Sequence, residues 1–422
     1  MTGRGIREPH GDRLPDVPAP PDARQLLDRA VIDEPYEFYE ALREHAPVWE
    51  VPGTDIVTVG TFALVAEAAG RVGDFSSHID CLLYRDADGL PARLPLGAAG
   101  VQALATADPP VHAEHRDTVF PSLVAARMAE LEPDIAALAD ERVRRSVDEG
   151  SVEFMSVVGT AVPIAVISRL IGFRDSDPGQ LLQAALDSTA MLGSTVDHDG
   201  LLALMLRSAE IQEWVGGQLA GALAEPTDGL LGTVADGVRS GTFSEFEAVV
   251  VLHTLLSAGG ESTASLLGNA VRILAERPDL QADLREDPGL IPPFIEEALR
   301  LEPPFRFHLR SVPHDTALGG VEVPAGATVL LLWGSANRDP ATFERAGSVD
   351  LARRVPRRHV AFGRGIHHCV GAPLARTEAG AVLRALLART SEFTLDPDRP
   401  PRWANSLMVR RHDELPLRLA PA

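Results

Sequence analysis

The pattern most suggestive of chemistry is a glycine-rich loop that ends in a cysteine. It reads Phe362-Gly-Arg-Gly-Ile-His-His-Cys369-Val-Gly371 and precedes an amphipathic stretch, residues 373–389, that predicts a helix. Glycines allow the backbone to approach a large planar ligand closely. The start of a helix is a positive field, which favours the thiolate form of Cys369. A zinc site is disfavoured, because His367, His368 and Cys369 are consecutive and no second cysteine lies nearby.

The other cysteine, Cys81, lies far from this loop in a stretch where we recognise no regular pattern. We expect it to be a buried, inert thiol. Two cysteines this far apart do not form a disulfide framework.

A single acid stands out in the longest apolar stretch of the chain. Ser244 and Glu247 form a capping-box pattern, and the helical pattern that follows lasts until Pro278, about 33 residues or about 50 Å. Between residues 248 and 271 the only Asp, Glu or Arg is Glu261, preceded by two glycines and followed by Ser262. Adjacent glycines weaken a helix by roughly 2 kcal/mol together, and a nearby hydroxyl can bend it.

Two interpretations of this segment remain open on the residues alone. The glycines could form a packing notch where another element crosses, with Glu261 facing a pocket of water. Alternatively, the acid and the alcohol could deliver protons inside a buried cavity.

The composition excludes several classes of function. All 39 basic residues of the 422 are arginine, so Schiff-base, pyridoxal-phosphate and P-loop lysines are absent. A formal charge of -21 argues against DNA and anionic membranes as partners. No apolar run approaches the length of a membrane span, and no signal-peptide pattern is present. We therefore expect a soluble, cytoplasmic protein.

The elements that must position these residues are mostly helices. Residues 1–24 are rich in proline and predict a flexible leader, and residues 25–422 predict one domain. Residues 35–43 and 129–147 predict helices. Short strands are expected at 48–51 and 55–59 and again within 318–333. The fold class expected is mostly α with small β-sheets.

The cysteine loop resembles the haem-binding loop of the cytochromes P450, F-G-x-G-x-H-x-C-x-G, through Phe362, Gly363, Gly365, His367, Cys369 and Gly371. Other patterns similar to that family occur in the expected order, and the resemblance covers the chain from about residue 35 onward. These patterns are Asp108-Pro-Pro-Val-His112-x-x-x-Arg116, Ala258-Gly259-x-Glu261-Ser262, Glu297-x-x-Arg300 and Ala336-Asn-Arg-Asp-Pro340.

The resemblance implies haem b, held between the long central helix and the cysteine loop, with Cys369 as the axial thiolate ligand of iron. Ala258 and Gly259 would lie in the oxygen-binding stretch of that helix. Cationic partners for the two haem propionates would be His112, Arg116, Arg310 and His367.

The resemblance also assigns a structural triad of Glu297, Arg300 and Arg353, which would support folding and haem retention. Glu261 and Ser262 would supply protons during oxygen activation. The family usually has threonine where this chain has Ser262, and serine lacks the methyl group that restricts the rotamer. Ser262 and Thr263 therefore both remain candidates for the relay hydroxyl.

The activity implied is that of a monooxygenase that hydroxylates or epoxidises a small molecule, in secondary metabolism or catabolism. Leucines within residues 77–106 favour a mainly apolar substrate, and Arg306 and His308 could bind a carboxylate or support a propionate. The alternatives are a peroxide-driven or isomerising haem-thiolate enzyme and a catalytically silent binding module. Pocket walls are expected from residues 77–106, 175–205, 255–261, 304–310 and 406–409.

Electrons would come from a ferredoxin and its NAD(P)H-dependent reductase, acting on a monomer. Residues 351–377 contain six arginines and no Asp or Glu, which inverts the overall charge locally. We expect a docking face for an acidic ferredoxin, because long-range attraction between opposite charges steers association. Its members would be Arg354, Arg357, Arg358 and Arg364.

Overall fold

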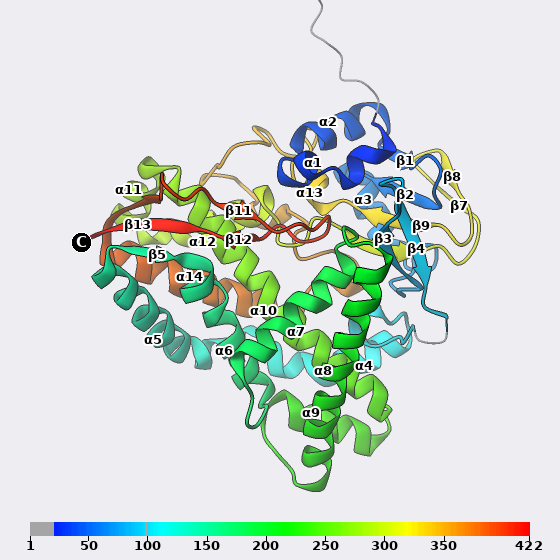
Figure 1. The fold of residues 1–422 in the computed structure, drawn as a ribbon, viewed down its shortest axis with the longest axis horizontal. Helices are drawn as coiled ribbons and strands as arrows, with labels where there is room; N and C mark the ends of the chain where they lie inside the picture. The colour runs from blue at the N-terminus through cyan, green and yellow to red at the C-terminus, as the bar shows by residue number, and fades with distance from the viewer. Residues whose placement is uncertain (1–20, 98–99) are drawn as a thin grey trace, which may run out of the picture.

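A computed structural model describes residues 21–97 and 100–422. Helices make up most of this part of the chain, with small sheets at its margins (Figure 1). The α-helices are α1 (Arg29–Asp33), α2 (Tyr36–His45), α3 (Phe62–Gly70), α4 (Val111–Val119), α5 (Ala125–Glu149), α6 (Ala161–Ile171), α7 (Pro178–Leu192), α8 (His198–Ala224), α9 (Gly229–Ser240), α10 (Glu245–Ala275), α11 (Pro278–Glu286), α12 (Ile291–Leu301), α13 (Trp333–Ala336) and α14 (Ala372–Arg389).

The central element is α10, which packs against α6, α7, α8, α9, α12 and α14. The predicted capping box forms, since Ser244 accepts from the Glu247 N–H and the Glu247 carboxylate accepts from the Ser244 N–H. The helix is 31 residues long and stays continuous through Gly259 and Gly260. A Cβ at either glycine would lie 2.7 or 2.6 Å from Ile167 or Ile164 of α6. The glycines therefore serve the close crossing of α6, as the packing-notch interpretation predicted.

Two of the sheets have more than two strands. One has the strand order β1-β2-β9-β6, with β2 and β9 parallel, and the other has the order β10-β13-β5. Two-stranded pairs join β3 to β4, β7 to β8 and β11 to β12. The strands are β1 (Val48–Glu50), β2 (Ile56–Val59), β3 (Cys81–Arg85), β4 (Pro91–Pro95), β5 (Ser151–Glu153), β6 (His308–Ser311), β7 (Thr316–Leu318), β8 (Val321–Val323), β9 (Thr328–Leu331), β10 (Thr390–Leu395), β11 (Arg402–Trp403), β12 (His412–Glu414) and β13 (Pro416–Pro421).

The strands expected near residues 48–59 and 318–333 are present, and those of the C-terminal region were not anticipated. Cys81 begins β3, so its assignment to an irregular stretch was wrong. The thiol is buried as expected, and its sulfur contacts the Thr328 hydroxyl at 3.3 Å.

Residues 1–20 of the predicted leader lie outside the described residues. Ala23, near the end of that leader, is already buried and opens the 3₁₀-helix Ala23–Leu27, whose N-terminus is capped by Asp22. Regular structure is thus already present before residue 25, within the predicted leader.

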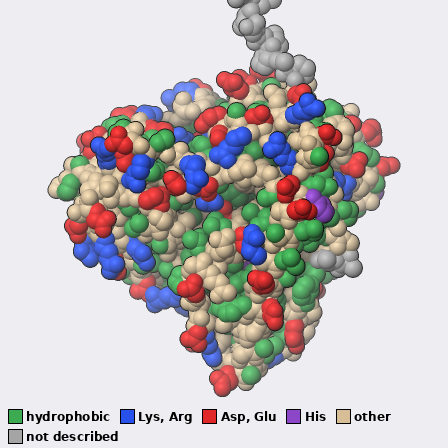
Figure 2. Space-filling view, in the orientation of Figure 1, with side chains coloured by type: hydrophobic (Ala, Val, Ile, Leu, Met, Phe, Trp, Pro, Cys, Tyr) green, Lys and Arg blue, Asp and Glu red, His purple; other side chains and the backbone are tan. Residues whose placement is uncertain are grey.

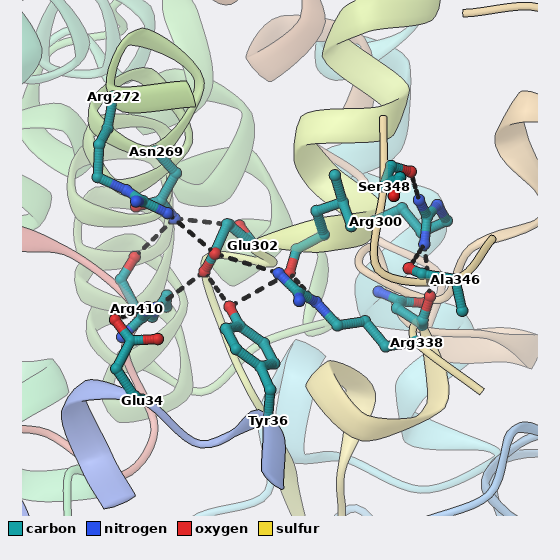
Figure 3. Close-up of polar contacts among 12 residues, drawn as sticks. Glu34, Tyr36, Asn269, Arg272, Arg300, Glu302, Arg338, Ala346, Ser348 and Arg410 are labelled. Atoms are coloured by element: carbon teal, nitrogen blue, oxygen red, sulfur yellow. Dashed lines mark hydrogen bonds and ion pairs between the residues drawn. The ribbon is translucent and has the colours of Figure 1, made fainter. Parts of the chain in front are cut away.

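A buried ionic cluster ties the first helices to the end of α12 and to the C-terminal region (Figure 3). The Glu302 carboxylate pairs with Arg272, Arg338 and Arg410 at 2.9–3.2 Å and accepts a hydrogen bond from Tyr36. These arginines hold the pKa of Glu302 down, to about 2, against the opposing effect of its burial. Since a buried carboxylate needs partners of this kind, the cluster fixes how these distant segments meet.

Candidate functional site

A cavity lies between the middle of α10 and the cysteine loop. Among the described residues that border it there is no Asp or Glu, whereas three arginines and four histidines do border it. Ala258, Gly259, Ser262 and Thr263 form its α10 wall, and Cys369 lies on the opposite wall. The cationic and imidazole groups are Arg116, Arg310, Arg364, His112, His308, His367 and His368.

The cysteine loop places the Cys369 sulfur at the cavity and at the start of α14. Gly363 and Gly365 have φ of +69° and +72°, conformations that a side chain would strain. The Cys369 N–H donates to the Phe362 carbonyl at 2.9 Å, which closes the loop. Although the side chain has accessible surface, that surface faces the cavity, so the thiol is removed from bulk water.

The electrostatic environment of Cys369 has opposing parts. Burial raises the pKa of the thiol, while the backbone N–H groups of Gly371 and Ala372 and the charge of Arg116 lower it. The field at the helix start predicted from the sequence is present, but burial outweighs it. A metal cation bound at the sulfur would supply the missing stabilisation, because a thiol that coordinates a metal is deprotonated.

The expected propionate partners lie together at the cavity. The His112 and His367 rings are 4.2 Å apart between centroids. Burial, together with neighbouring cationic groups including Arg310 and Arg116, lowers the pKa of His367 to about 3. Burial lowers the pKa of Arg310 to about 10. Several arginine and histidine side chains are thus close together, and no acid borders the cavity in the described chain. This arrangement favours a ligand that carries negative charge.

Glu261, Ser262 and Thr263 were expected to act together, but their side chains lie in different environments on α10. Ser262 borders the cavity and its hydroxyl donates to the Ala258 carbonyl, while Thr263 borders the cavity too. Glu261 does not border it. Its carboxylate accepts from Arg411 at 2.9 Å and from the Thr189 hydroxyl of α7.

Glu261 is thus a link to α7 and the C-terminal region rather than a side chain in the cavity. Burial raises the pKa of Glu261 to about 7, with Arg411 acting in the opposite direction. Arg411 also pairs with Asp413 at 2.9 Å, a residue that is about one-third exposed, at 34%. Glu261 is therefore linked through Arg411 to Asp413 near the surface, and it precedes Ser262 and Thr263 on α10.

The three residues assigned to a structural triad contact one another. Arg300 donates two hydrogen bonds to Glu297, both of 2.8 Å, and Arg353 donates to the same carboxylate at 2.8 Å. Glu297 and Arg300 are fully buried. Arg300 also donates to the carbonyls of Asn337 and Ser348, so the triad anchors the segment leading to the cysteine loop.

The four arginines expected at a docking face are exposed. Arg357 is 71% exposed although it lies 3.6 Å from Glu296, and Arg358 stacks over Phe62 of α3. The two other arginines of the run are occupied, Arg353 by Glu297 and Arg376 by Glu296.

The pocket walls expected from residues 175–205 and 406–409 do not border the cavity, and from 77–106 only Leu104 and Ala105 do. The α7–α8 connection instead packs on the C-terminal segment, where the Leu407 N–H donates to the Gly193 carbonyl at 2.9 Å. The expectation that Arg306 could bind a ligand was also wrong. It is buried away from the cavity and donates to the carbonyls of Ile32 and Ser406.

Several residues of the site were not predicted from the sequence. Trp333, His368 and Arg364 border the cavity, and Arg411 and Thr189 bind Glu261. Their partners lie far away in the sequence, so local spacing carried no signal for these contacts. For His368 and Arg364 the signal was present, since both belong to the cysteine loop, and Arg364 was expected only at the docking face.

Comparison with known proteins agrees with this arrangement. The family model described as Cytochrome P450 matches residues 290–414. The chain is 40% identical over 398 residues to Cytochrome P450 144 of Mycobacterium tuberculosis, covering 94% of this chain and 91% of that protein. It is 30% identical over 399 residues to beta-dihydromenaquinone-9 omega-hydroxylase of Mycobacterium bovis, covering 94% and 78%. CYP109E1 from Bacillus megaterium in complex with testosterone superposes with a TM-score of 0.82 at 27% identity, covering 93% and 99%.

In this mostly helical domain, Cys369 and the middle of α10 border one cavity, an arrangement that suits a haem-thiolate enzyme. This chain belongs to the cytochrome P450 family, and it is a monooxygenase with haem b and an axial cysteine thiolate. The cavity fits that cofactor, since it offers one thiol and several cationic donors for two propionates. In the described part of the chain, no helix has the length and hydropathy that crossing a membrane requires.

Proposed function

We propose that this protein uses electrons from a ferredoxin to insert one oxygen atom into a mainly apolar small molecule, by hydroxylation or epoxidation. The observation that carries the proposal is the cavity itself. Cys369 faces an alcohol-bearing turn of α10 across a space bordered by cationic and apolar side chains. The apolar side chains that border this space, including Leu104, Ile167 and Leu255, favour an apolar guest beside the haem.

Cys369 would hold the iron, because Cys81 is enclosed in β3 beside Thr328 and does not reach the cavity. Haem b bound through this thiolate supplies the chemistry of oxygen activation, in which the electron-rich sulfur favours O–O cleavage. Arg116 and Arg310 would pair with the two propionates, which need cationic partners in an interior. His112 and His367 would donate hydrogen bonds to the same groups.

The residues of α10 would control protons. Ser262 and Thr263 both border the cavity and both carry a hydroxyl group. Glu261 stands behind them, bound to Arg411 and near the surface acid Asp413. A carboxyl group whose pKa is about 7 changes protonation state near neutral pH, as a proton donor in catalysis requires.

The proposal is tested through the coupling of NADH oxidation to product formation in a system reconstituted with ferredoxin and reductase. We expect Ser262→Ala to lower the product formed per NADH several-fold, because Ser262 borders the cavity and follows Glu261 in the chain. Thr263→Ala is the matched control, and uncoupling by Thr263→Ala alone would move the relay to Thr263. Turnover with peroxide alone and none with ferredoxin would contradict the monooxygenase proposal.

The electron donor would bind beside the cysteine loop. Arg354, Arg357, Arg358 and Arg364 are exposed there, together with the apolar side chains of Val355 and Ile366. An apolar centre with a charged rim is the usual anatomy of a transient protein interface. This charge favours an acidic ferredoxin as the partner.

A further inference from the structure

We propose that His308 is a specificity-determining residue that donates one hydrogen bond, from Nε2–H, to an uncharged oxygen acceptor of the substrate such as a ketone carbonyl. The inference rests on the proposed function, because it assigns a substrate class to the same cavity. Its support is the pairing of His308 with Trp333 and the place of both residues at the cavity wall.

The Trp333 contact fixes the tautomer of the imidazole. The indole Nε1–H of Trp333 donates to Nδ1 of His308 at 2.6 Å. An indole nitrogen is a donor only, so Nδ1 must be unprotonated and the hydrogen of the neutral ring must be on Nε2. Turning the ring over would put a carbon atom against the indole N–H, so this geometry admits one orientation.

The same surroundings keep His308 neutral. Burial, followed by the charge of Arg310, lowers the pKa of His308 to about 3. In the described chain no group hydrogen-bonds Nε2, and that atom is not enclosed by protein. Since His308 borders the cavity, its free N–H is available to whatever the cavity contains.

On β6, His308 lies next to the groups expected to bind the propionates, and it is among the groups that lower the pKa of His367. His308 and Arg310 are two residues apart on this strand and project from the same face, roughly 7 Å apart along it. Arg310 lies at the cationic end of the cavity. His308 lies toward Phe305, whose ring meets it edge-on at 5.4 Å between centroids.

An uncharged donor beside an aromatic wall suits a neutral acceptor. Arg306, the nearest cation on the preceding segment, is directed to backbone carbonyls outside the cavity. A carboxylate at His308 would lose its hydration, and Arg310, the cation that acts on His308, is the group expected to pair with a propionate. A carbonyl oxygen loses less and is satisfied by one hydrogen bond.

The experiment compares ketones with the hydrocarbons of the same skeleton. The probes are 2-adamantanone with adamantane, and 5α-androstan-3-one with 5α-androstane. Binding to the haem-loaded ferric protein is followed by the Soret shift on displacement of the iron-bound water, a readout that needs no turnover or ferredoxin. The variants are His308→Leu, which removes the donor, and His308→Gln, whose amide can accept from Trp333 and still donate to the cavity.

We expect His308→Leu to raise the Kd of the ketones about three- to tenfold, the value of one net hydrogen bond. The Kd of the hydrocarbons should change by less than about twofold, and His308→Gln should restore ketone affinity. Equal effects of His308→Leu on both members of each pair would overturn the proposal. So would a failure of every ketone to bind. Because no step is catalysed, these results stand apart from success or failure of the proposed oxygenation.

Two spectroscopic measurements complete the test. In ¹⁵N–¹H spectra of the diamagnetic ferrous carbon-monoxide form, we expect His308 to be the neutral Nε2–H tautomer, and Trp333→Phe to release a mixture of tautomers. An Nδ1–H or doubly protonated ring in the wild type would overturn the proposal. Resonance Raman propionate bending modes should be the same in wild type and His308→Leu. A shift in these modes would assign His308 to the cofactor and not to the substrate.

Discussion

Glu261 and Ser262 are neighbours in the chain but lie in different environments. The serine side chain borders the cavity, and the glutamate side chain is directed to Arg411 and Thr189. A helix turns by about 100° per residue, so consecutive side chains face different elements. The acid therefore titrates in response to α7 and the C-terminal region rather than to the contents of the cavity.

This environment predicts a pH dependence of stability. Burial raises the pKa of Glu261 from 4.5 to about 7. The folded chain thus holds this proton more tightly than the unfolded chain does. The resulting stabilisation is present below pH 4.5 and is lost as the pH rises through about 7. Glu261→Gln does not titrate, so wild type should lose up to about 3 kcal/mol relative to this variant over that range.

Urea unfolding of both proteins, followed by tryptophan fluorescence below pH 4.5 and above pH 7, measures the difference. Parallel stability profiles for wild type and Glu261→Gln would show that the carboxyl group titrates normally. A rise in the relative stability of wild type with pH would reverse the sign and contradict the burial argument.

At the level of elements, the cavity depends on how closely α6 crosses α10. Gly260 admits Ile164 of α6, because a Cβ at that position would lie 2.6 Å from its Cδ1 atom. The next nearest atoms, in Ala185 and Ile164, would be 3.6 and 3.7 Å away. One methyl group therefore accounts for the close contact.

We expect Gly260→Ala to lower the free energy of unfolding by about 1–2 kcal/mol, because overpacking exceeds the gain of about 1 kcal/mol in helix propensity. Ile164→Val removes the methyl group that clashes and should itself cost about 1 kcal/mol. The double variant should be more stable than the sum of the single effects predicts, by about 1 kcal/mol or more. Additive effects in urea unfolding would show that α6 does not constrain Gly260.

Contacts between residues close together in the chain could be predicted from the sequence, whereas contacts between distant residues could not. The capping box at Ser244 and the cysteine loop are encoded by residues close together, so their spacing predicted them. The spacing of Glu297 and Arg300 indicated a helix pair, and the family resemblance alone implied that the pair is structural and buried. The Arg411–Glu261 pair joins residues 150 positions apart, and the Trp333–His308 bond depends on strand pairing between β6 and β9. The strands of the C-terminal region were missed for the same reason, because they pair with the distant β5 or with short partners.

At the scale of the whole molecule, the net charge is negative, but the surface beside the cysteine loop carries exposed arginines. The formal charge is -21, and Figure 2 shows acidic and arginine side chains interspersed over one face. Arginines elsewhere are commonly paired with acids, such as Arg389 with Asp140 and Arg384 with Glu132. The docking proposal depends on the exposed arginines beside the cysteine loop, of which Arg357 also lies 3.6 Å from Glu296.

Charge reversal of Arg357 and Arg358 should slow reduction by an acidic ferredoxin at least about tenfold at low salt, because electrostatic steering raises association rates by 10–10³. The effect should shrink as salt is added, and substrate-induced Soret shifts should be unchanged. Stopped-flow reduction measures it. Reversal of Arg144 and Arg145, an exposed pair on α5, is the matched control. Equal slowing by both double variants would contradict a local docking face.

The central claim is that Cys369 is the thiolate ligand of the haem iron. The most direct test is the absorption spectrum of the reduced haem-loaded protein with carbon monoxide, in wild type, Cys369→Ser and Cys81→Ser. We predict the long-wavelength Soret band typical of thiolate ligation in wild type and in Cys81→Ser, and its loss in Cys369→Ser. Persistence of that band in Cys369→Ser, or its absence from wild type, would contradict the account.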